Sequence, residues 1–138
     1  MLRRLSRCLI YLWVAPYTLS GIAIGLILGG RFRRIQGVIE IHGPRVQKAL
    51  SSMPVPAMAM TFGHVVFGAT DVALDITRKH EHVHVRQYER WGVFFVPAYL
   101  LASFYMRLRG RDAYRDNPFE VEAYAIDTPD YSSSAGDR

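Results

Sequence analysis

A run of 22 residues without a charged side chain, residues 8–29, most constrains how this chain can fold. As an α-helix the run would be about 33 Å long, enough to cross a bilayer core of about 30 Å. Arginines close both ends, three within residues 1–7 and three within residues 31–34. This pattern is typical of membrane helices, so we predict an N-terminal anchor over residues 1–30 that spans the lipid bilayer once. Because both flanks are basic, the orientation of the span stays open.

Two other structures fit the same run. A signal peptide also begins with basic residues, but its apolar core is usually about 7–15 residues long and a cleavage site follows. A helix buried inside a soluble protein is the third option. Pro16 could kink the helix or divide it into a hairpin within one leaflet. Gly21, Gly25 and Gly29 recur at every fourth position, which in lipid permits close helix pairing. Helix-mediated self-association is one interpretation of this spacing; the other is that glycine is simply common in membrane helices.

Composition narrows the class of protein. The chain has 138 residues, the size of one small domain, with a formal net charge of +5 and 50% hydrophobic residues. The basic residues flank apolar segments and do not line a helix that could read a nucleic-acid groove, so no nucleic-acid partner is expected. Cys8 is the single cysteine, which excludes an intrachain disulfide and a cysteine-rich zinc module.

Beyond the anchor, alternation, turn residues and helix-start residues predict a mixed α+β fold. The expected elements are a short strand at 37–44, a brief helix or loop at 45–52, a second strand at 57–68, a helix at 71–88, an apolar helix at 91–106 and a helix from Asn117. The uncharged helix at 91–106 is short for a membrane span, so a buried or interfacial position is favoured over a second crossing. The domain is expected over residues 31–126, followed by a polar, disordered tail at 127–138.

One motif carries chemistry. His80, Glu81 and His84 satisfy the pattern H-E-x-x-H. Positions i and i+4 project from the same side of a helix, so both histidines can offer imidazole nitrogens to one metal ion. Glu81 lies about 100° around the helix, close enough to orient an attacking water and take its proton. His82 is expected to point elsewhere. The alternative is a solvated helix that carries three histidines by accident.

A catalytic zinc site of this type needs a third protein ligand. Glu120 lies 36 residues after His84, on the helix that begins with Asn117 as N-cap and Pro118 in its first turn. Glu120 is the expected ligand, with Glu122 or no acidic ligand as alternatives. Alternatively, Glu120 could have only a local role at the third position of the helix, where its side chain would bond to the backbone amide of the N-cap residue in a capping box.

His80-Glu81-x-x-His84 followed by Glu120-x-x-Ala123 resembles the gluzincin pattern of zinc metallopeptidases, in which two histidines and a downstream helical glutamate bind zinc. Glu-x-x-Ala is similar to the third-ligand helix of membrane-bound peptidases that process prenylated proteins and of their bacterial heat-shock relatives; Tyr124 stands where those proteins usually have Asp. The sequence around these motifs, residues 84–88 and 114–120, also resembles compact bacterial membrane-anchored proteins of unknown function that are predicted to be minimal gluzincins.

The resemblance covers about residues 57–126 and implies a zincin-like core. It also implies that residues 57–68 form an edge strand beside which an extended peptide or protein substrate lies. Such a site needs partners that fix the histidine tautomers and a donor for the developing oxyanion. Asp112 and Asp116 are candidates for the first role, and Tyr88, Tyr114 and Tyr124 for the second.

Together these observations predict a membrane-associated zinc metallopeptidase that hydrolyses peptide bonds, with His80, His84 and Glu120 as ligands of Zn²⁺ and Glu81 as the catalytic base. The alternative is a non-catalytic membrane protein, in which a structural or vestigial metal site belongs to a scaffold or to a subunit of a complex.

Overall fold

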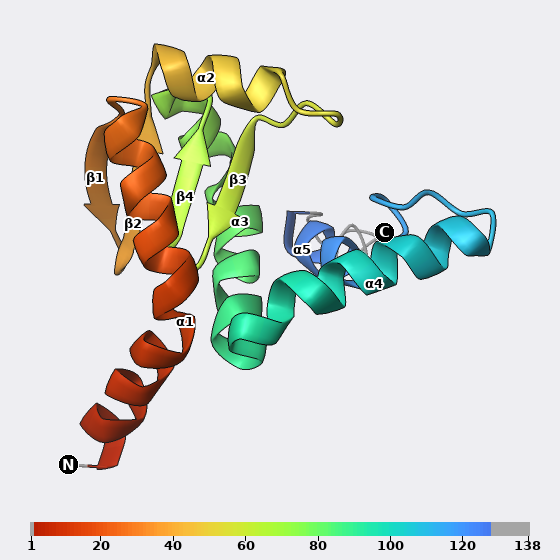
Figure 1. Cartoon of the computed structure of the whole chain (residues 1–138), viewed down its shortest axis with the longest axis horizontal. Helices are drawn as coiled ribbons and strands as arrows, with labels where there is room; N and C mark the ends of the chain where they lie inside the picture. The colour runs from red at the N-terminus through yellow and green to blue at the C-terminus, as the bar shows by residue number, and fades with distance from the viewer. Residues whose placement is uncertain (1, 128–138) are drawn as a thin grey trace, which may run out of the picture.

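The structure is a computed structural model that describes residues 2–127, so the tail expected at 127–138 lies outside the described residues except for Asp127. The chain is a mixed α+β protein with an N-terminal apolar helix, as predicted (Figure 1). Its elements are α1 (Leu2–Ile27), β1 (Arg31–Ile35), β2 (Val38–His42), α2 (Pro44–Ser51), β3 (Ala59–Phe62), β4 (Val65–Gly68), α3 (Asp71–Trp91), the 3₁₀ turn η1 (Gly92–Phe94), α4 (Phe95–Leu108) and α5 (Pro118–Asp127).

The four strands form one sheet in the order β1-β2-β4-β3. The two inner strands, β2 and β4, are parallel, and each outer strand is antiparallel to its neighbour. Two sequence predictions are corrected here. The residues of β1 were expected only as a basic flank of the anchor. Residues 57–68 were expected as a single strand, but they form a hairpin that turns at Gly63, where φ is 62° and only glycine is unstrained.

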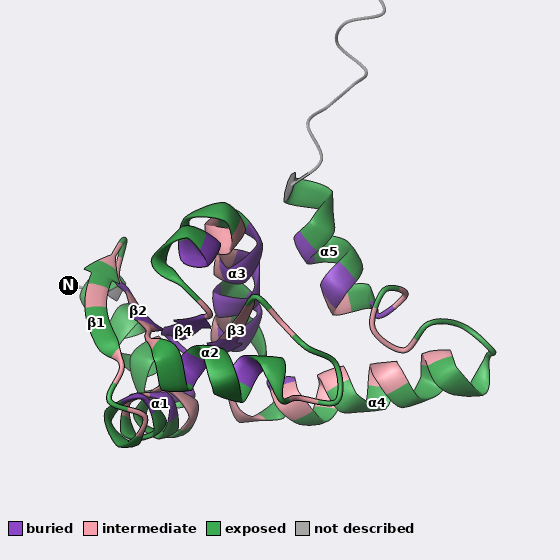
Figure 2. Cartoon of the chain, turned by 90° about the horizontal axis from the view of Figure 1, so that it is seen from above, coloured by how far each residue is buried: buried purple, intermediate pink, exposed green. Residues whose placement is uncertain are grey.

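Helices cover both faces of the sheet (Figure 2). Val46 and Leu50 of α2 pack with Ile41 and Val65 on one face. Leu74 of α3 belongs to a separate apolar cluster on the other face. Strand residues therefore alternate between two buried environments, and every residue of β4 is buried. This double burial explains why β3 and β4 look like one continuous apolar run in the sequence.

The second half of α1 packs directly on the sheet. A Cβ atom at Gly25 would lie 2.5 Å from Cδ1 of Ile41, and one at Gly21 would lie 3.0 Å from Cβ of Val65. These two glycines therefore serve contact between α1 and the sheet within one chain, and their face of α1 is not open to a second helix. Self-association through another face of α1 stays a prediction.

Within residues 2–127, two helical stretches are long and apolar enough to cross a membrane, Arg3–Ile27 and Asp71–Leu108. The second comprises α3, η1 and α4, with a change of direction at Gly92, whose φ is 57°. Phe95 is the one residue of α4 that is buried, so the predicted buried position is wrong, and the interfacial position stays a prediction. The helix projects from the body of the molecule, and the chain after it leads back to α5, which packs against α3 (Figure 1).

Candidate metal centre

Helix α3 presents two histidines to one point. Its start is fixed by Thr70, whose side chain accepts a hydrogen bond from the backbone amide of Ala73 at 3.0 Å, a typical N-cap. His80 and His84 follow one helical turn apart, and their Nε2 atoms are 3.2 Å from each other. Both side chains are buried. The predicted i, i+4 juxtaposition is therefore present in the structure.

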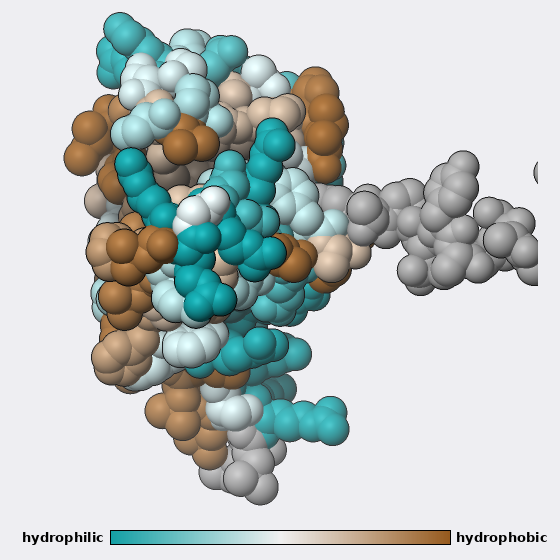
Figure 3. Space-filling model, turned by 90° about the vertical axis from the view of Figure 1, so that its right-hand side faces the viewer, coloured by the Kyte–Doolittle hydropathy of each residue, from teal (hydrophilic) through white to brown (hydrophobic). Residues whose placement is uncertain are grey.

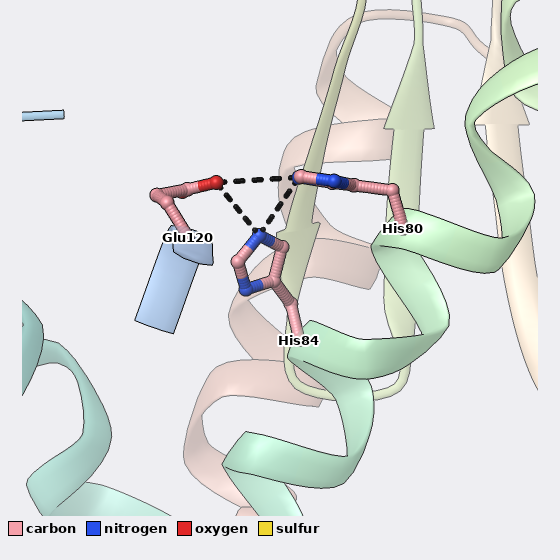
Figure 4. Close-up of side chains that lie close together, drawn as sticks. All are labelled: His80, His84 and Glu120. Carbon is pink, nitrogen blue, oxygen red and sulfur yellow. Dashed lines mark hydrogen bonds and ion pairs between the residues drawn. The ribbon is translucent and has the colours of Figure 1, made fainter. Parts of the chain in front are cut away.

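Helix α5 brings a carboxylate to the same point. Asn117 caps α5 by accepting a hydrogen bond from the amide of Phe119 at 3.0 Å, and Oε2 of Glu120 lies 3.2 Å from Nε2 of His80 and 3.4 Å from Nε2 of His84. Figure 4 shows the three side chains converging. Glu122, the alternative ligand, is exposed and accepts a hydrogen bond from Gln87.

The three side chains suit a transition-metal ion. One ligand atom from each of His80, His84 and Glu120 lies within 4.8 Å of the others, and all three residues are buried. Among the residues that the structure describes, Oε2 of Glu120 is enclosed without a hydrogen-bond partner. A buried carboxylate oxygen left this way is costly unless a cation neutralises it. Two imidazole nitrogens and a carboxylate oxygen form a ligand set that zinc and neighbouring divalent metals accept.

Gln87 orients His84, a role that the sequence analysis did not assign. The Gln87 amide nitrogen donates hydrogen bonds to the carbonyl of Phe119 at 3.0 Å and to Oε2 of Glu122 at 3.1 Å. Its oxygen therefore faces Nδ1 of His84, at 2.8 Å, and this oxygen can only accept. Nδ1 of His84 must carry the hydrogen, which leaves the Nε2 lone pair of the neutral ring for a metal. The clue in the sequence was that Gln87 follows His84 by three positions on the same helix, a spacing at which two side chains are neighbours.

The other carboxylate oxygen of Glu120 is held from α4. Tyr99 donates its hydroxyl hydrogen to Oε1 of Glu120 at 2.6 Å. Asp112 and Asp116, the predicted partners of the histidines, instead accept hydrogen bonds from backbone amides of their own loop between α4 and α5. Tyr99 and Gln87 thus orient ligands at positions where the sequence analysis named no residue.

Charges within the cluster favour an ionised Glu120. Burial by itself would raise the pKa of this carboxyl, but the facing imidazoles of His80 and His84, together with the hydrogen bond from Tyr99, lower the pKa to about 2. Burial by itself would lower the pKa of His84, but the facing carboxylate of Glu120 and the charge of Glu81 raise it. An anionic carboxylate facing two imidazoles is the charge distribution that a bound cation reinforces.

Glu81 lies beside the cluster and is held by the sheet. The hydroxyl of Thr61, on β3, donates to Oε2 of Glu81 at 2.6 Å, and both residues are buried. Burial raises the pKa of Glu81, while the nearby charge of His84 and the Thr61 hydrogen bond oppose the rise. A carboxyl with a raised pKa beside a metal site can exchange protons near neutral pH.

The three tyrosines proposed for oxyanion binding occupy different places. Tyr88 donates to the carbonyl of Thr61 at 3.3 Å. Tyr114 and Tyr124 hydroxyls lie 3.1 Å apart, and the ring of Tyr124 lies 4.5 Å from the ring of His80. Tyr124 is therefore the tyrosine of the three that directly contacts a member of the cluster.

Comparison with known proteins adds no relative: no protein-family model matches the chain, and none of the curated proteins or solved structures does. The likeness to gluzincins therefore depends on the two short motifs and on the geometry that brings them together.

Proposed function

We propose that this protein is a zinc metallopeptidase that acts at a membrane surface. The observation that carries the proposal is the convergence of His80, His84 and Glu120 with Glu81 buried beside them. His84 on the H-E-x-x-H helix and Glu120 on the third-ligand helix are 36 positions apart in the sequence, yet their expected ligand atoms and that of His80 lie within 4.8 Å of one another. Two histidines that lie together by accident would not explain why a carboxylate on a separate helix is directed at the same point.

In this proposal each residue of the site has one task. His80, His84 and Glu120 hold Zn²⁺, which when bound lowers the pKa of water and polarises a carbonyl group. Glu81 takes a proton from the attacking water and passes it to the leaving amine, so that one peptide bond is broken and one water consumed. Thr61 keeps the Glu81 carboxylate in position, and Gln87 and Tyr99 orient His84 and Glu120.

The substrate in this proposal is an extended segment of a peptide or protein. Strand β3 is an edge of the sheet, so one side of its backbone can pair with an added strand. The same strand carries Thr61, whose side chain contacts Glu81. A substrate paired with β3 would therefore run past the metal site.

A second candidate function is supported by the burial of the cluster. His80, His84 and Glu120 are each less than a tenth exposed, and Glu120 links α5 to α3. A metal held there would fasten α5 to the body of the protein without any reaction. The chain would then be a non-catalytic membrane protein with a structural metal.

Zinc content and peptide hydrolysis, measured on purified protein and matched variants, separate these functions. Native protein is expected to bind about one zinc per chain. Glu81→Gln is expected to keep the zinc and to lose hydrolysis by about 10²-fold or more. Glu120→Gln is expected to lose zinc, whereas Glu122→Gln, the control on the same helix, keeps both properties. Absence of zinc from folded native protein would overturn both functions. If native protein binds zinc but hydrolyses peptides no faster than Glu81→Gln protein, the metal is structural and the chain is not a peptidase.

A further inference from the structure

The outward side of α1 is a continuous apolar stripe. Five of its exposed large residues recur at intervals of three, four or seven positions, which places these five along one side of the helix. They are Leu5, Leu9, Leu12, Leu19 and Leu26. A helix side that faced water along its whole length would carry polar residues, and this one carries none of the charged types between residues 8 and 30. The stripe therefore requires an apolar partner.

The opposite side of α1 is occupied by the protein. Val14 is fully buried, Gly21 and Gly25 contact the sheet, and Thr18 meets His64 of the turn between β3 and β4. From Val14 onwards the helix therefore cannot be surrounded by lipid. The twelve residues before it, 2–13, span only about 18 Å, short of a bilayer core of about 30 Å. A perpendicular crossing by α1 would draw the sheet into the hydrocarbon.

Helix α4 repeats the pattern. Four exposed apolar residues of η1 and α4 also recur along one side: Phe94, Leu101, Phe104 and Leu108. The inward side carries Phe95, which is buried, and Tyr99, which contacts Glu120. The apolar side of α4 is therefore exposed, while its other side faces the metal centre.

The two stripes join into one surface. The rings of Trp13 and Phe94 lie 5.9 Å apart, and a shallow groove of about 460 Å³ between α1 and η1 has an apolar lining that includes Leu9 and Val93. Seen from above, α1 and α4 lie along the same side of the molecule, with α3 and α5 on the other (Figure 2). Hydrophobic residues gather along the left edge of Figure 3, which is the side that faces the viewer in Figure 1.

Charge at the rim of this surface suits a lipid bilayer. Residues 3–30 and 91–111 contain six arginines, three in each segment, and no aspartate or glutamate. Those in the first segment stand at the free end of α1, and those in the second at the far end of α4, and all six are exposed. A second copy of the chain would bring like charges together, whereas an anionic leaflet would attract them.

We propose that α1 and α4 lie together in the plane of one leaflet of an anionic membrane, with neither helix crossing it. The leucine and phenylalanine stripes enter the acyl region, and the arginines at both ends contact lipid phosphates. Because α4 also carries Tyr99, the helix that rests in the leaflet positions Glu120 on its other side. If the proposed peptidase function holds, its substrates are peptide bonds close to the membrane surface; the attachment itself does not depend on that function.

Vesicle binding tests the surface. Protein diluted from detergent is mixed with vesicles of phosphatidylcholine alone or of phosphatidylcholine and phosphatidylglycerol in equal parts, then sedimented. Leu12→Glu on α1 and Leu101→Glu on α4 are each expected to weaken binding to the anionic vesicles by about tenfold or more. Ile76→Glu, at a comparably exposed position of α3 (65% against 72% and 68%), is the control and should bind like native protein. Circular dichroism establishes that each variant is folded.

Vesicle binding that is weakened by Leu12→Glu but not by Leu101→Glu would overturn the proposal that α1 and α4 form one membrane-binding surface. So would equal binding of native protein to both kinds of vesicle, since the arginines would then have no role. A dimer in detergent-free solution that is broken by both substitutions, together with no sedimentation with vesicles, would assign the surface to a second copy and contradict the proposal.

Thiol labelling in sealed membrane vesicles of uniform orientation tests whether α1 crosses. In a Cys8→Ser background, Ser6→Cys reports the free end of α1 and Ser51→Cys reports α2. An impermeant maleimide is expected to label both positions from the same side of the membrane. Labelling of one position before permeabilisation and of the other only afterwards would show that α1 spans the bilayer, and would overturn the proposal even if the protein proves to be a peptidase.

Discussion

The two faces of the sheet are built from different chemistry. On the α3 side lie buried polar groups with hydrogen-bond partners: Glu81 accepts from Thr61, and Glu40 accepts from Arg78 of α3. On the α1 side, glycines of the helix meet the branched side chains of Ile41 and Val65 with little space between them. The α3 side is therefore sensitive to lost hydrogen bonds and charges, and the α1 side to added volume.

Alternation along the strands produces this division. In β2, Glu40 faces α3 while its neighbour Ile41 faces α1. In β3, Thr61 contacts α3 while the next residue, Phe62, lies against Gly21 of α1. Because successive side chains of a strand point to opposite faces, a shift of one residue in register would exchange the two environments. The predictions below test each side in turn.

The largest effect is expected on the α1 side. Gly25→Leu places a side chain where even a Cβ atom would lie 2.5 Å from Ile41 and 3.0 Å from Phe32. We expect a loss of about 3 kcal/mol in the free energy of unfolding, because the helix must move away from the sheet. Chemical denaturation of the protein in detergent measures it. Ala23→Leu, on the exposed side of the same helix, is the control, and a similar loss there would show that packing on the sheet is not the cause.

From the sequence, the arrangement on the α3 side of the sheet could be predicted more fully than that on the α1 side. Helical spacing suffices to place His80 beside His84, and the N-cap Asn117 sets the start of the helix that carries Glu120. The position of α1 could not be predicted, because lipid and a protein interior select the same apolar residues. The hairpin was missed for a related reason: β4 is buried on both faces, so its sequence lacks alternation, and Gly63 was the single clue to a turn.

The next effect concerns the charge network on the α3 side. Glu40 is almost fully buried and accepts hydrogen bonds from Arg33 at 2.7 Å and Arg78 at 2.8 Å. Glu40→Gln leaves the two guanidinium groups without their carboxylate. Since both arginines can still reach water, we expect a loss of about 2 kcal/mol in the free energy of unfolding at neutral pH. Asp75→Asn, an exposed carboxylate bonded to the same arginines, is the control and should lose about 0.5 kcal/mol or less.

The same network gives a pH dependence with a definite sign. Burial would raise the pKa of Glu40, but hydrogen bonds from Arg78 and Arg33 outweigh it and hold the pKa below its ordinary value of 4.5. The stabilisation is therefore complete above pH 4.5 and is lost as the pH falls through the lower pKa of the folded protein. Unfolding curves of native and Glu40→Gln protein should converge in acid. A constant difference at every pH would contradict this assignment.

A smaller effect is expected where Gln87 orients His84. Gln87→Leu preserves approximate side-chain size but removes the acceptor at Nδ1 of His84, which fixes the tautomer. Loss of such an outer hydrogen bond typically weakens metal binding by about 10- to 100-fold. Competition with a zinc chelator measures the affinity. Glu122→Gln changes the exposed partner of the same amide and should retain zinc. Equal weakening in both variants would place the effect in the contact between α3 and α5.

The smallest effect is expected at Thr61, and it depends on the proposed peptidase function. Thr61→Val keeps the shape of the side chain but removes the hydroxyl that donates to Glu81 at 2.6 Å. We expect kcat for peptide hydrolysis to fall about tenfold, the effect of one hydrogen bond to a charged group, with zinc content and KM unchanged. Thr61→Ser restores the hydroxyl without the methyl group and should recover most of the rate. If Thr61→Ser is as slow as Thr61→Val, the loss comes from the missing methyl group and its packing between β3 and α3, and the hydrogen bond does not matter. If both variants are as fast as native protein, the hydrogen bond from Thr61 does not contribute to catalysis by Glu81.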